Sequence, residues 1–514
     1  MSVPMFDEER GKTRAVAPVV VILTGITLLG LAIRLLGLTA YGIFWDEAYH
    51  VQLVRLPSVG AMLDAILSNP PSDPLYALAL RVWTGVFGTG DEAIRSLSVA
   101  CSTLTIPATY LMGRALAGTW IGVLGALLFA VSPYALELGQ EGALYAFAAL
   151  FITLALTVGW RCHTEGRGAG PYVLLGCIAI YSHYVAAVIL GLFALLAWLP
   201  VGGPRKVAGR DWALAHILIL CSWLPWLVAL LVHWLNLDIP RATIMHSATF
   251  DEVTGALVQY TSGSAALLTT RFLLEAVGLF AGGTLIVLGW LAGRDAAKRG
   301  LRVTLAISGL IFALPLIASA LSGLWLFVPH FMIFLLPALL CAVSAGAFYG
   351  MQIAINRHTP ALTRRATPLI VGGLLLAWLG AQLWGIVLYN KYPPHGVDGL
   401  RDLAAVLTVE STPDDTILVM PPILTPPIQQ YFTRSVHGLP SDFDLRAIYL
   451  PFGDADWNAR ARATLDSRVQ GYSRFWLIYY PADDFNGDFL RGVGTKYDQL
   501  EYHHYQFADL YLFR

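Results

Sequence analysis

The sequence predicts a multi-span α-helical membrane protein with a C-terminal α/β domain outside the membrane. Of its 514 residues, 56% are hydrophobic and only 13% are charged, and the mean hydropathy is +0.62. In soluble domains about a quarter of the residues are charged. Apolar windows of roughly 20 residues, the length that crosses a bilayer, recur up to about residue 390. Beyond that point the apolar density falls to that of a soluble domain.

Eleven apolar windows are interpreted as membrane spans. They lie at residues 17–38, 92–113, 118–136, 142–160, 170–183, 185–201, 211–234, 272–292, 301–321, 330–349 and 367–389. The first is too long for a signal-peptide core and no cleavage pattern follows it, so we expect a retained first helix. The fifth and sixth are short and meet at residues 181–184, which leaves open whether they are two spans or one hairpin bent at the outer surface.

Charge bias orients these spans. Arginine and lysine gather in alternate connections, including Arg114, Arg167, Lys206 and Arg299, while acidic residues gather in the others. Basic connections are cytoplasmic by the positive-inside rule. We therefore expect a cytoplasmic N-terminus and an extracytoplasmic C-terminal segment.

Composition also excludes several functions. The net charge is −1 and no continuous basic face is present, which excludes typical nucleic-acid binding. The five cysteines lie in or beside apolar windows and show neither a disulfide framework nor the spacing of zinc ligands.

We predict two domains. Residues 1–390 form the membrane domain, with a first outer loop at 39–91, and residues 391–514 form an extracytoplasmic α/β domain. Within the loop, the apolar segment 75–87 is too short to span and is expected to lie along the membrane surface. In the last domain, residues 401–407 favour a helix, and residues 416–420 and 475–480 favour buried strands.

The strongest chemical signal is the segment Phe44-Trp45-Asp46-Glu47-Ala48-Tyr49-His50, directly outside the first span. Two adjacent carboxylates there form either an acidic collar beneath the interfacial aromatic belt or a general base held where a lipid-borne substrate presents its head group. Trp45 is correspondingly either a belt residue or a sugar-stacking side chain.

Further polar segments follow in a characteristic order. They are Ser72-Asp73-Pro74-Leu75-Tyr76, Gln140-Glu141-Gly142-Ala143-Leu144-Tyr145, Tyr181-Ser182-His183-Tyr184 and Pro329-His330-Phe331. On this topology they resemble the GT-C glycosyltransferases that use polyprenyl-phosphate sugars, especially bacterial relatives of protein O-mannosyltransferases and of lipid A aminoarabinose or galacturonic acid transferases. The resemblance covers roughly residues 17–390. The chain departs from the family where Asp73 replaces a histidine, where the 140–145 stretch lacks an arginine, and where His330 replaces an arginine.

The resemblance implies a GT-C fold of about 11 transmembrane helices and an inverting glycosyltransferase with Asp46 as the catalytic base. Glu47 is its neighbour, and Asp73 is either a turn residue or a second carboxylate. Groups expected to bind the donor phosphate and lipid are His183, Tyr184, Tyr145, Arg95, Arg241, Arg271 and His330. Those expected at the sugar or acceptor are Trp45, Tyr49, His50, Gln140 and Glu141.

A sugar on polyprenyl phosphate carries its own leaving group, so the reaction needs a base and stabilisation of the departing phosphate. We expect no obligatory cofactor or metal, although the carboxylates alone leave a role for a divalent cation open. The expected partners are the lipid-linked donor, an envelope glycan, glycolipid or protein acceptor, and the bilayer. Arginine outnumbers lysine strongly, which with the family pattern indicates a bacterial inner membrane.

Two other functions compete with the transferase. A flippase or transporter of lipid-linked sugar should show related halves and charges at mid-membrane, whereas the acidic residues here lie at the outer ends of the spans. A non-catalytic scaffold presenting the outer domain leaves the carboxylates of the first loop without a purpose.

Overall fold

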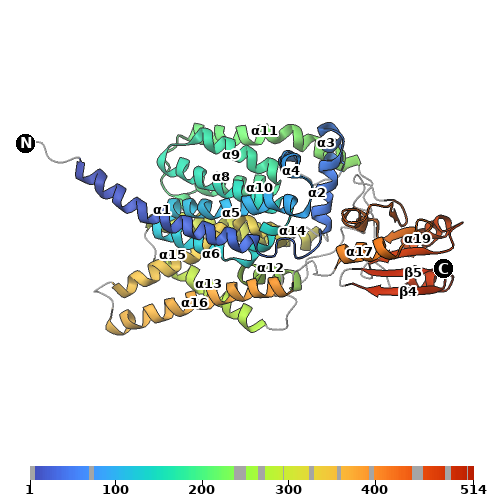
Figure 1. The fold of residues 1–514 in the computed structure, drawn as a ribbon. Coiled ribbons are helices and arrows are strands. Elements are labelled where there is room, and N and C mark those ends of the chain that lie inside the picture. Colours follow the sequence, from blue (N-terminus) through green and yellow to red (C-terminus); the bar gives the residue numbers. More distant parts are fainter. Residues whose placement is uncertain are drawn as a thin grey trace, which may run out of the picture. The chain divides into compact units, whose positions relative to one another are not determined.

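The computed structural model describes residues 6–68, 74–236, 250–263, 272–292, 295–322, 329–355, 360–392, 399–442, 455–480, 488–505 and 508–514. Their contacts divide the chain into two compact units. The bundle unit comprises residues 1–37, 95–225 and 247–391, and the loop–sheet unit comprises residues 38–94, 226–246 and 392–514. Figure 1 shows the fold of the chain.

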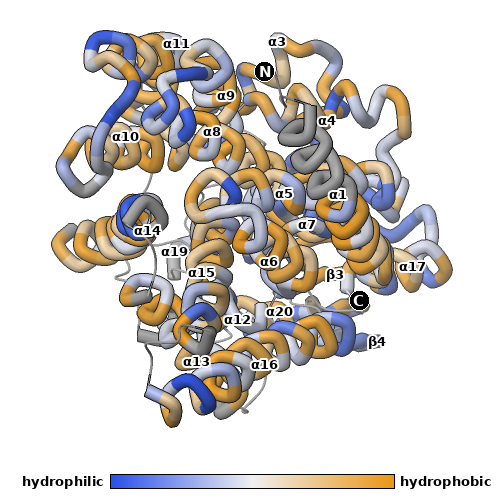
Figure 2. The backbone as a smooth tube through the Cα atoms, turned by 90° about the vertical axis from the view of Figure 1, so that its left-hand side faces the viewer, coloured by the Kyte–Doolittle hydropathy of each residue, from blue (hydrophilic) through white to orange (hydrophobic). Residues whose placement is uncertain are grey.

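The bundle unit consists of helices along which hydrophobic residues predominate (Figure 2). They are α1 (Phe6–Leu35), α5 (Asp91–Leu116), α6 (Thr119–Ala130), α7 (Pro133–Gln140), α8 (Tyr145–Glu165), α9 (Ala169–Ser182), α10 (Val185–Trp198), η1 (Pro200–Gly202), α11 (Gly209–Asn236), α12 (Phe250–Ser262), α13 (Phe272–Ala292), α14 (Asp295–Ser322), η4 (Pro329–Leu335), α15 (Leu336–Ile355) and α16 (Ala361–Lys391). The first residues of α5 and the last of α11 belong to the loop–sheet unit.

Seven of the described helices are long and apolar enough to cross a membrane, or eight if the bent pair α6–α7 counts as one span. The predicted many-span helical architecture is confirmed, while the number eleven stays a prediction. Two of the predicted windows correspond to α9 and α10, of 14 residues each. The break between them falls at His183-Tyr184, within the predicted 181–184 junction.

A buried arginine explains how α6 and α7 bend by 58°. Arg34, near the end of α1, is fully buried. Its guanidinium donates to the carbonyls of Phe129 and Ala130 at 3.3 and 3.1 Å, and to Ser102 Oγ at 2.7 Å. A bend frees carbonyls that lipid cannot satisfy, so Arg34 supplies the donors. Arg34 was not among the residues predicted from the sequence, although an arginine in an apolar window indicates a buried polar role.

The loop–sheet unit contains three short helices of the first outer loop: α2 (Trp45–Arg55), α3 (Val59–Leu67) and α4 (Pro74–Phe87). They share a buried apolar cluster that includes Leu53, Met62 and Ala77. The 14-residue α4 matches the predicted short apolar segment 75–87. The contacts group this loop with residues 392–514. The predicted division into a membrane domain of residues 1–390, which includes the loop, and a domain of residues 391–514 stays a prediction.

The C-terminal part of this unit is built around a five-stranded sheet of order β2-β1-β3-β5-β4. The strands are β1 (Thr416–Met420), β2 (His437–Gly438), β3 (Phe475–Tyr479), β4 (Gln499–His504) and β5 (Asp509–Phe513). β1 runs parallel to β2 and β3, and β5 runs antiparallel to β3 and β4. β1 and β3 coincide with the predicted strands.

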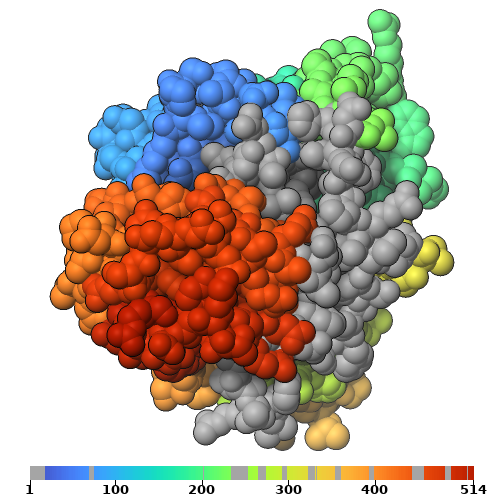
Figure 3. Space-filling model, turned by 90° about the vertical axis from the view of Figure 1, so that its right-hand side faces the viewer, coloured from blue at the N-terminus to red at the C-terminus, as the bar shows by residue number. Residues whose placement is uncertain are grey.

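Helices cover both faces of the sheet. Alternate strand residues such as Ile417 and Val419 pack with α17 (Leu400–Glu410) and the region of η5 (Pro422–Leu424) and α18 (Thr425–Gln429). The intervening residues Leu418 and Met420 pack with α19 (Ala455–Arg468) and α20 (Asp488–Gly494). The predicted α/β tail is thus a three-layer arrangement, whose residues form a continuous orange-to-red surface in Figure 3.

Candidate functional site

The two carboxylates at the start of α2 have different surroundings. Glu47 is the third residue of the helix, only 1% exposed, and its Oε2 accepts the backbone N–H of Phe44 at 3.0 Å. It therefore caps the helix N-terminus, where unpaired backbone N–H groups favour an anionic acceptor. Asp46 lies in the same turn and is exposed. The geometry thus distinguishes a structural Glu47 from an accessible Asp46.

Further contacts fix the rest of α2. His50 is 6% exposed, and its ring meets the Tyr76 ring edge-on at 4.8 Å and the Tyr49 ring at 5.4 Å. Burial lowers the pKa of His50 to about 4 against the opposing charge of Glu47, so the ring is neutral near pH 7. At the other end, Arg81 of α4 donates to the carbonyls of Val54 and Leu56 at 3.2 and 2.8 Å. Contacts along its length therefore hold the helix that carries Asp46 in place.

Among the residues that the structure describes, Nδ1 of His50 has no hydrogen-bond partner. A buried polar atom without a partner costs free energy. His50 and Tyr49, which were predicted to lie at the sugar or acceptor, are both on the helix that carries Asp46.

In the bundle unit, the structure brings together four residues predicted to bind the donor phosphate or lipid. Tyr145 stacks on His330 with ring centroids 5.6 Å apart, and His183 stacks on Tyr184 at 4.7 Å. Phe331, adjacent to His330, contacts the His183 ring at 4.6 Å. We call these five side chains the aromatic–imidazole cluster. Phe331 was quoted in a motif but given no role, because nothing in the sequence places it beside His183.

The tautomer of His183 follows from its local contacts. His183 is 3% exposed and its Nδ1 accepts the backbone N–H of Val185 at 3.2 Å. A neutral ring that accepts at Nδ1 carries its proton at Nε2. His183 can therefore offer one N–H donor, which suits a phosphate oxygen.

The remaining predicted residues of the bundle unit are buried. Arg95 is fully buried in α5, and Glu141, which follows α7, is 5% exposed. Gln140 donates from Nε2 to the carbonyls of Arg34 and Leu36, both at 2.8 Å. Its amide group thus holds the end of α1, and its predicted contact with sugar or acceptor stays untested.

Three residues predicted to act at the site lie outside the described residues: Asp73, Arg241 and Arg271. Trp45 begins α2, but its side chain is not among those described.

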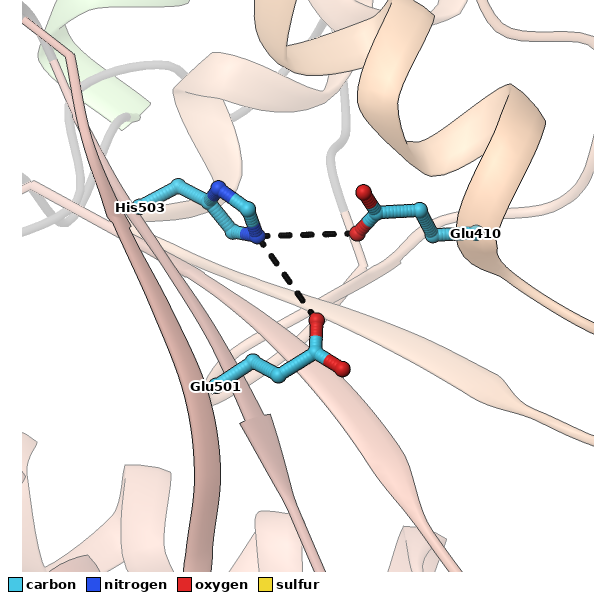
Figure 4. Close-up of side chains that lie close together, drawn as sticks. All are labelled: Glu410, Glu501 and His503. Carbon is cyan, nitrogen blue, oxygen red and sulfur yellow. Dashed lines mark ion pairs between the residues drawn. The ribbon is translucent and has the colours of Figure 1, made fainter.

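A histidine and two carboxylates approach one another in the loop–sheet unit. His503 Nε2 lies 3.5 Å from Glu410 Oε2 and 3.7 Å from Glu501 Oε2 (Figure 4). Both glutamates are exposed. Contacts of this length to exposed carboxylates contribute little to stability, and the arrangement includes none of the residues predicted to act in catalysis.

Comparisons with known proteins identify the fold. Residues 68–228 match the family described as dolichyl-phosphate-mannose-protein mannosyltransferase. ArnT from Cupriavidus metallidurans in its apo crystal structure is similar over 98% of both chains, with a TM-score of 0.60 and 13% identity. The archaeal oligosaccharyltransferase AglB from Archaeoglobus fulgidus, in complex with an inhibitory peptide and a dolichol-phosphate, is similar over 96% of this chain and 74% of its own, with a TM-score of 0.57 and 12% identity.

A third similar structure is the arabinofuranosyltransferase AftD from Mycobacteria, with a TM-score of 0.54 and 15% identity over 96% of this chain and 39% of its own. No curated protein sequence matches the chain. These similarities confirm the GT-C resemblance predicted from the sequence. The chain is a multi-pass membrane protein with the GT-C fold.

Proposed function

We propose that this GT-C-fold protein is an inverting glycosyltransferase. It moves a sugar from a polyprenyl-phosphate donor to an acceptor hydroxyl at the extracytoplasmic face of the membrane. The observation that carries the proposal is the exposed Asp46 in the first turn of α2, beside a Glu47 already used as a helix cap. ArnT from Cupriavidus metallidurans, which shares the fold, has also been crystallised bound to undecaprenyl phosphate.

Asp46 acts as the general base in this proposal. Its carboxylate takes the proton of the acceptor hydroxyl while the hydroxyl oxygen bonds to the anomeric carbon. The bond between that carbon and the phosphate oxygen breaks, and polyprenyl phosphate leaves with the electron pair. A single direct displacement inverts the anomeric centre. General-base catalysis is typically worth about a hundred- to ten-thousand-fold in rate.

The departing phosphate needs hydrogen-bond donors or cations in a site of low dielectric constant. For this we propose Arg95 and the aromatic–imidazole cluster, in which His183 supplies the Nε2–H donor and His330 and Tyr145 lie stacked. Arg241 and Arg271 remain candidates for the same role. We propose no obligatory metal, and Asp73 remains a candidate second carboxylate.

The acceptor is an envelope glycan, a glycolipid or a protein. The proposed location is a bacterial inner membrane, with the N-terminus in the cytoplasm and the C-terminal sheet region outside. Asp46 would then act on the side where lipid-linked rather than nucleotide-linked sugars are the available donors.

The test is to purify wild-type and Asp46→Asn protein in detergent and to identify co-purifying lipids by mass spectrometry. We expect a glycosylated polyprenyl phosphate, with the intact donor enriched in Asp46→Asn because the base is lost and little volume changes. Equal amounts of the lipid in both proteins would favour a carrier or flippase. Absence of any polyprenyl lipid in both would remove the support for this donor class.

A further inference from the structure

The C-terminal sheet region binds the first outer loop through the carboxylate of Asp91, the first residue of α5. This side chain is 11% exposed. Its Oδ2 accepts hydrogen bonds from Arg401 Nη2 at 2.5 Å and from the Tyr431 hydroxyl at 2.6 Å, and its Oδ1 accepts from Gln430 Nε2 at 3.3 Å. We call these four residues the Asp91 junction. Charge-assisted bonds of this kind are stronger than those between neutral groups.

The same side chains hold the backbone that leads into α2. Arg401 donates from Nη1 to the carbonyl of Thr39 at 3.0 Å and from Nη2 to that of Tyr41 at 3.3 Å. The Tyr431 hydroxyl also accepts the N–H of Ile43 at 2.6 Å. Residues 39–43 are therefore fixed by the C-terminal region immediately before the helix that begins with Trp45-Asp46.

Apolar packing extends the junction onto α2 itself. Tyr431 packs against a buried cluster of Ile43, Ala48, Val51 and Ile94, two of which lie on α2. The backbone at Gly42 also lies close to Arg401 and Tyr431, since a Cβ added at Gly42 would lie 3.5 Å from Arg401 Cβ and 3.6 Å from Tyr431 Cε2. The Tyr431 ring thus supports the helix of Asp46, while its hydroxyl links Asp91 to Ile43.

We propose that Arg401 and Tyr431 are positioning residues for Asp46, so that the C-terminal region aligns the base without contributing a catalytic group. The inference rests on the proposed function, because Asp46 must be the base. A base has to stand within hydrogen-bond reach of the proton it takes. A displacement of about 1 Å in such a group can cost a hundredfold in rate. The junction reduces that displacement by fixing both the entry to α2 and its inner face.

Two conservative variants test the junction without removing its packing. Tyr431→Phe keeps the ring and loses the hydroxyl that joins Asp91 to Ile43. Arg401→Lys keeps the charge and loses the fork of donors. The matched control is Arg474→Lys, since Arg474 pairs with Asp415 at 2.6 Å and is 30% exposed against 37% for Arg401. The hydrogen bonds of Arg474 go to residues 410–415, within the sheet region.

The assay follows release of undecaprenyl phosphate from a synthetic undecaprenyl-phosphate monosaccharide that the wild-type protein turns over, in the presence of a cell-envelope fraction that supplies the acceptor hydroxyl. We expect kcat to fall about ten- to a hundredfold in Tyr431→Phe and Arg401→Lys, with KM for the donor unchanged, because the lost alignment acts on the reaction step. Backbone hydrogen exchange of residues 39–48 should rise in both variants. Arg474→Lys should change neither quantity.

Unchanged kcat in both junction variants would overturn the inference. An equal fall in Arg474→Lys would also overturn it, because that result indicates a general loss of stability in the sheet region. Failure of the proposed function is distinguishable: Asp46→Asn would then retain transfer, and hydrogen exchange in Tyr431→Phe would still report whether the junction holds residues 39–48.

Discussion

The bundle unit and the loop–sheet unit use buried polar side chains for different purposes. In the bundle, Arg34, Gln140 and Gln382 all donate to backbone carbonyls. In the loop–sheet unit, the carboxylates of Asp91 and Asp415 collect donors from side chains of separate segments. Backbone carbonyls freed within lipid have no water to accept hydrogen bonds from. The described residues of the first outer loop are instead not paired into the sheet, so side-chain hydrogen bonds must order them. Polar residues therefore stabilise bends in the bundle and join segments in the loop–sheet unit.

The largest effect is expected from removing a bundle donor. Arg34→Met keeps side-chain length but takes away the donors to the carbonyls of Phe129 and Ala130 at the α6–α7 bend. Because each buried unsatisfied group costs about 1–3 kcal/mol, we expect a loss of roughly 3 kcal/mol or more, measured by thermal unfolding in detergent. Arg161→Met is the control, since Arg161 forms an exposed pair with Glu165. Equal stability of the two variants would contradict the role assigned to the bundle donors.

The stability of the loop helices should depend on pH because of His50. Burial lowers the pKa of this ring to about 4, below the ordinary value of roughly 6.5. The folded state keeps its full stability above the pKa that His50 has in the unfolded chain. This stability falls as pH drops from there toward 4, because the unfolded chain binds the proton first. Between pH 7.5 and 5 the loss should be about 2 kcal/mol. In thermal unfolding at the two pH values, the loss of stability should be about 2 kcal/mol smaller in His50→Phe than in wild type and in His437→Gln. An equal loss in His50→Phe and wild type would locate the titrating group elsewhere.

An effect of similar size is expected at Asp415, the second carboxylate that joins segments. Burial acts to raise its pKa, but hydrogen bonds from Arg474 and Thr412 lower the pKa below the usual aspartate range. Its stabilisation is therefore present at neutral pH and is lost as pH falls below roughly 3.9 toward the folded value. Asp415→Asn should cost about 2 kcal/mol at pH 7 and reduce the acid sensitivity of urea unfolding. Asp498→Asn, which alters an exposed pair with Arg514, should show the urea unfolding of wild type. Wild-type unfolding of Asp415→Asn would refute the stabilising role of Asp415.

The smallest effect is expected at the helix cap. Glu47→Ala removes the acceptor for the Phe44 N–H and should cost about 1 kcal/mol. The exposed acid Glu92, in the first turn of α5, is the control, and Glu92→Ala should change the unfolding temperature by less. A larger effect at Glu92 than at Glu47 would show that the cap is not the main role of Glu47.

Hydropathy predicted the parts of the fold whose sequence is continuously apolar. The long apolar helices and the fully buried strands β1 and β3 follow from this signal. The exposed, polar β4 (Gln499–His504) escaped it, and so did β2, which has only two residues. The α6–α7 bend could not be predicted because the contact between Arg34 and Ala130 joins positions 96 residues apart.

The candidate site was predictable in residue type but not in division of roles. The Asp-Glu pair identified the segment, yet only the helix start at Trp45 shows that Glu47 meets the Phe44 N–H and Asp46 is exposed. The pairing of Asp91 with Arg401 across 310 residues has no local sequence signature. Stacking of Tyr145 on His330 likewise depends on packing between distant elements.

The most direct test of the account compares Asp46→Asn with Glu47→Gln in the transfer assay. Both substitutions replace a carboxylate by an amide of similar volume, and the side-chain oxygen that Glu47→Gln retains can still accept the Phe44 N–H. We expect Asp46→Asn to lower kcat at least about a hundredfold, while Glu47→Gln keeps most of the activity. Near-normal turnover by Asp46→Asn would contradict the account and transfer the role of base to Glu47 or Asp73.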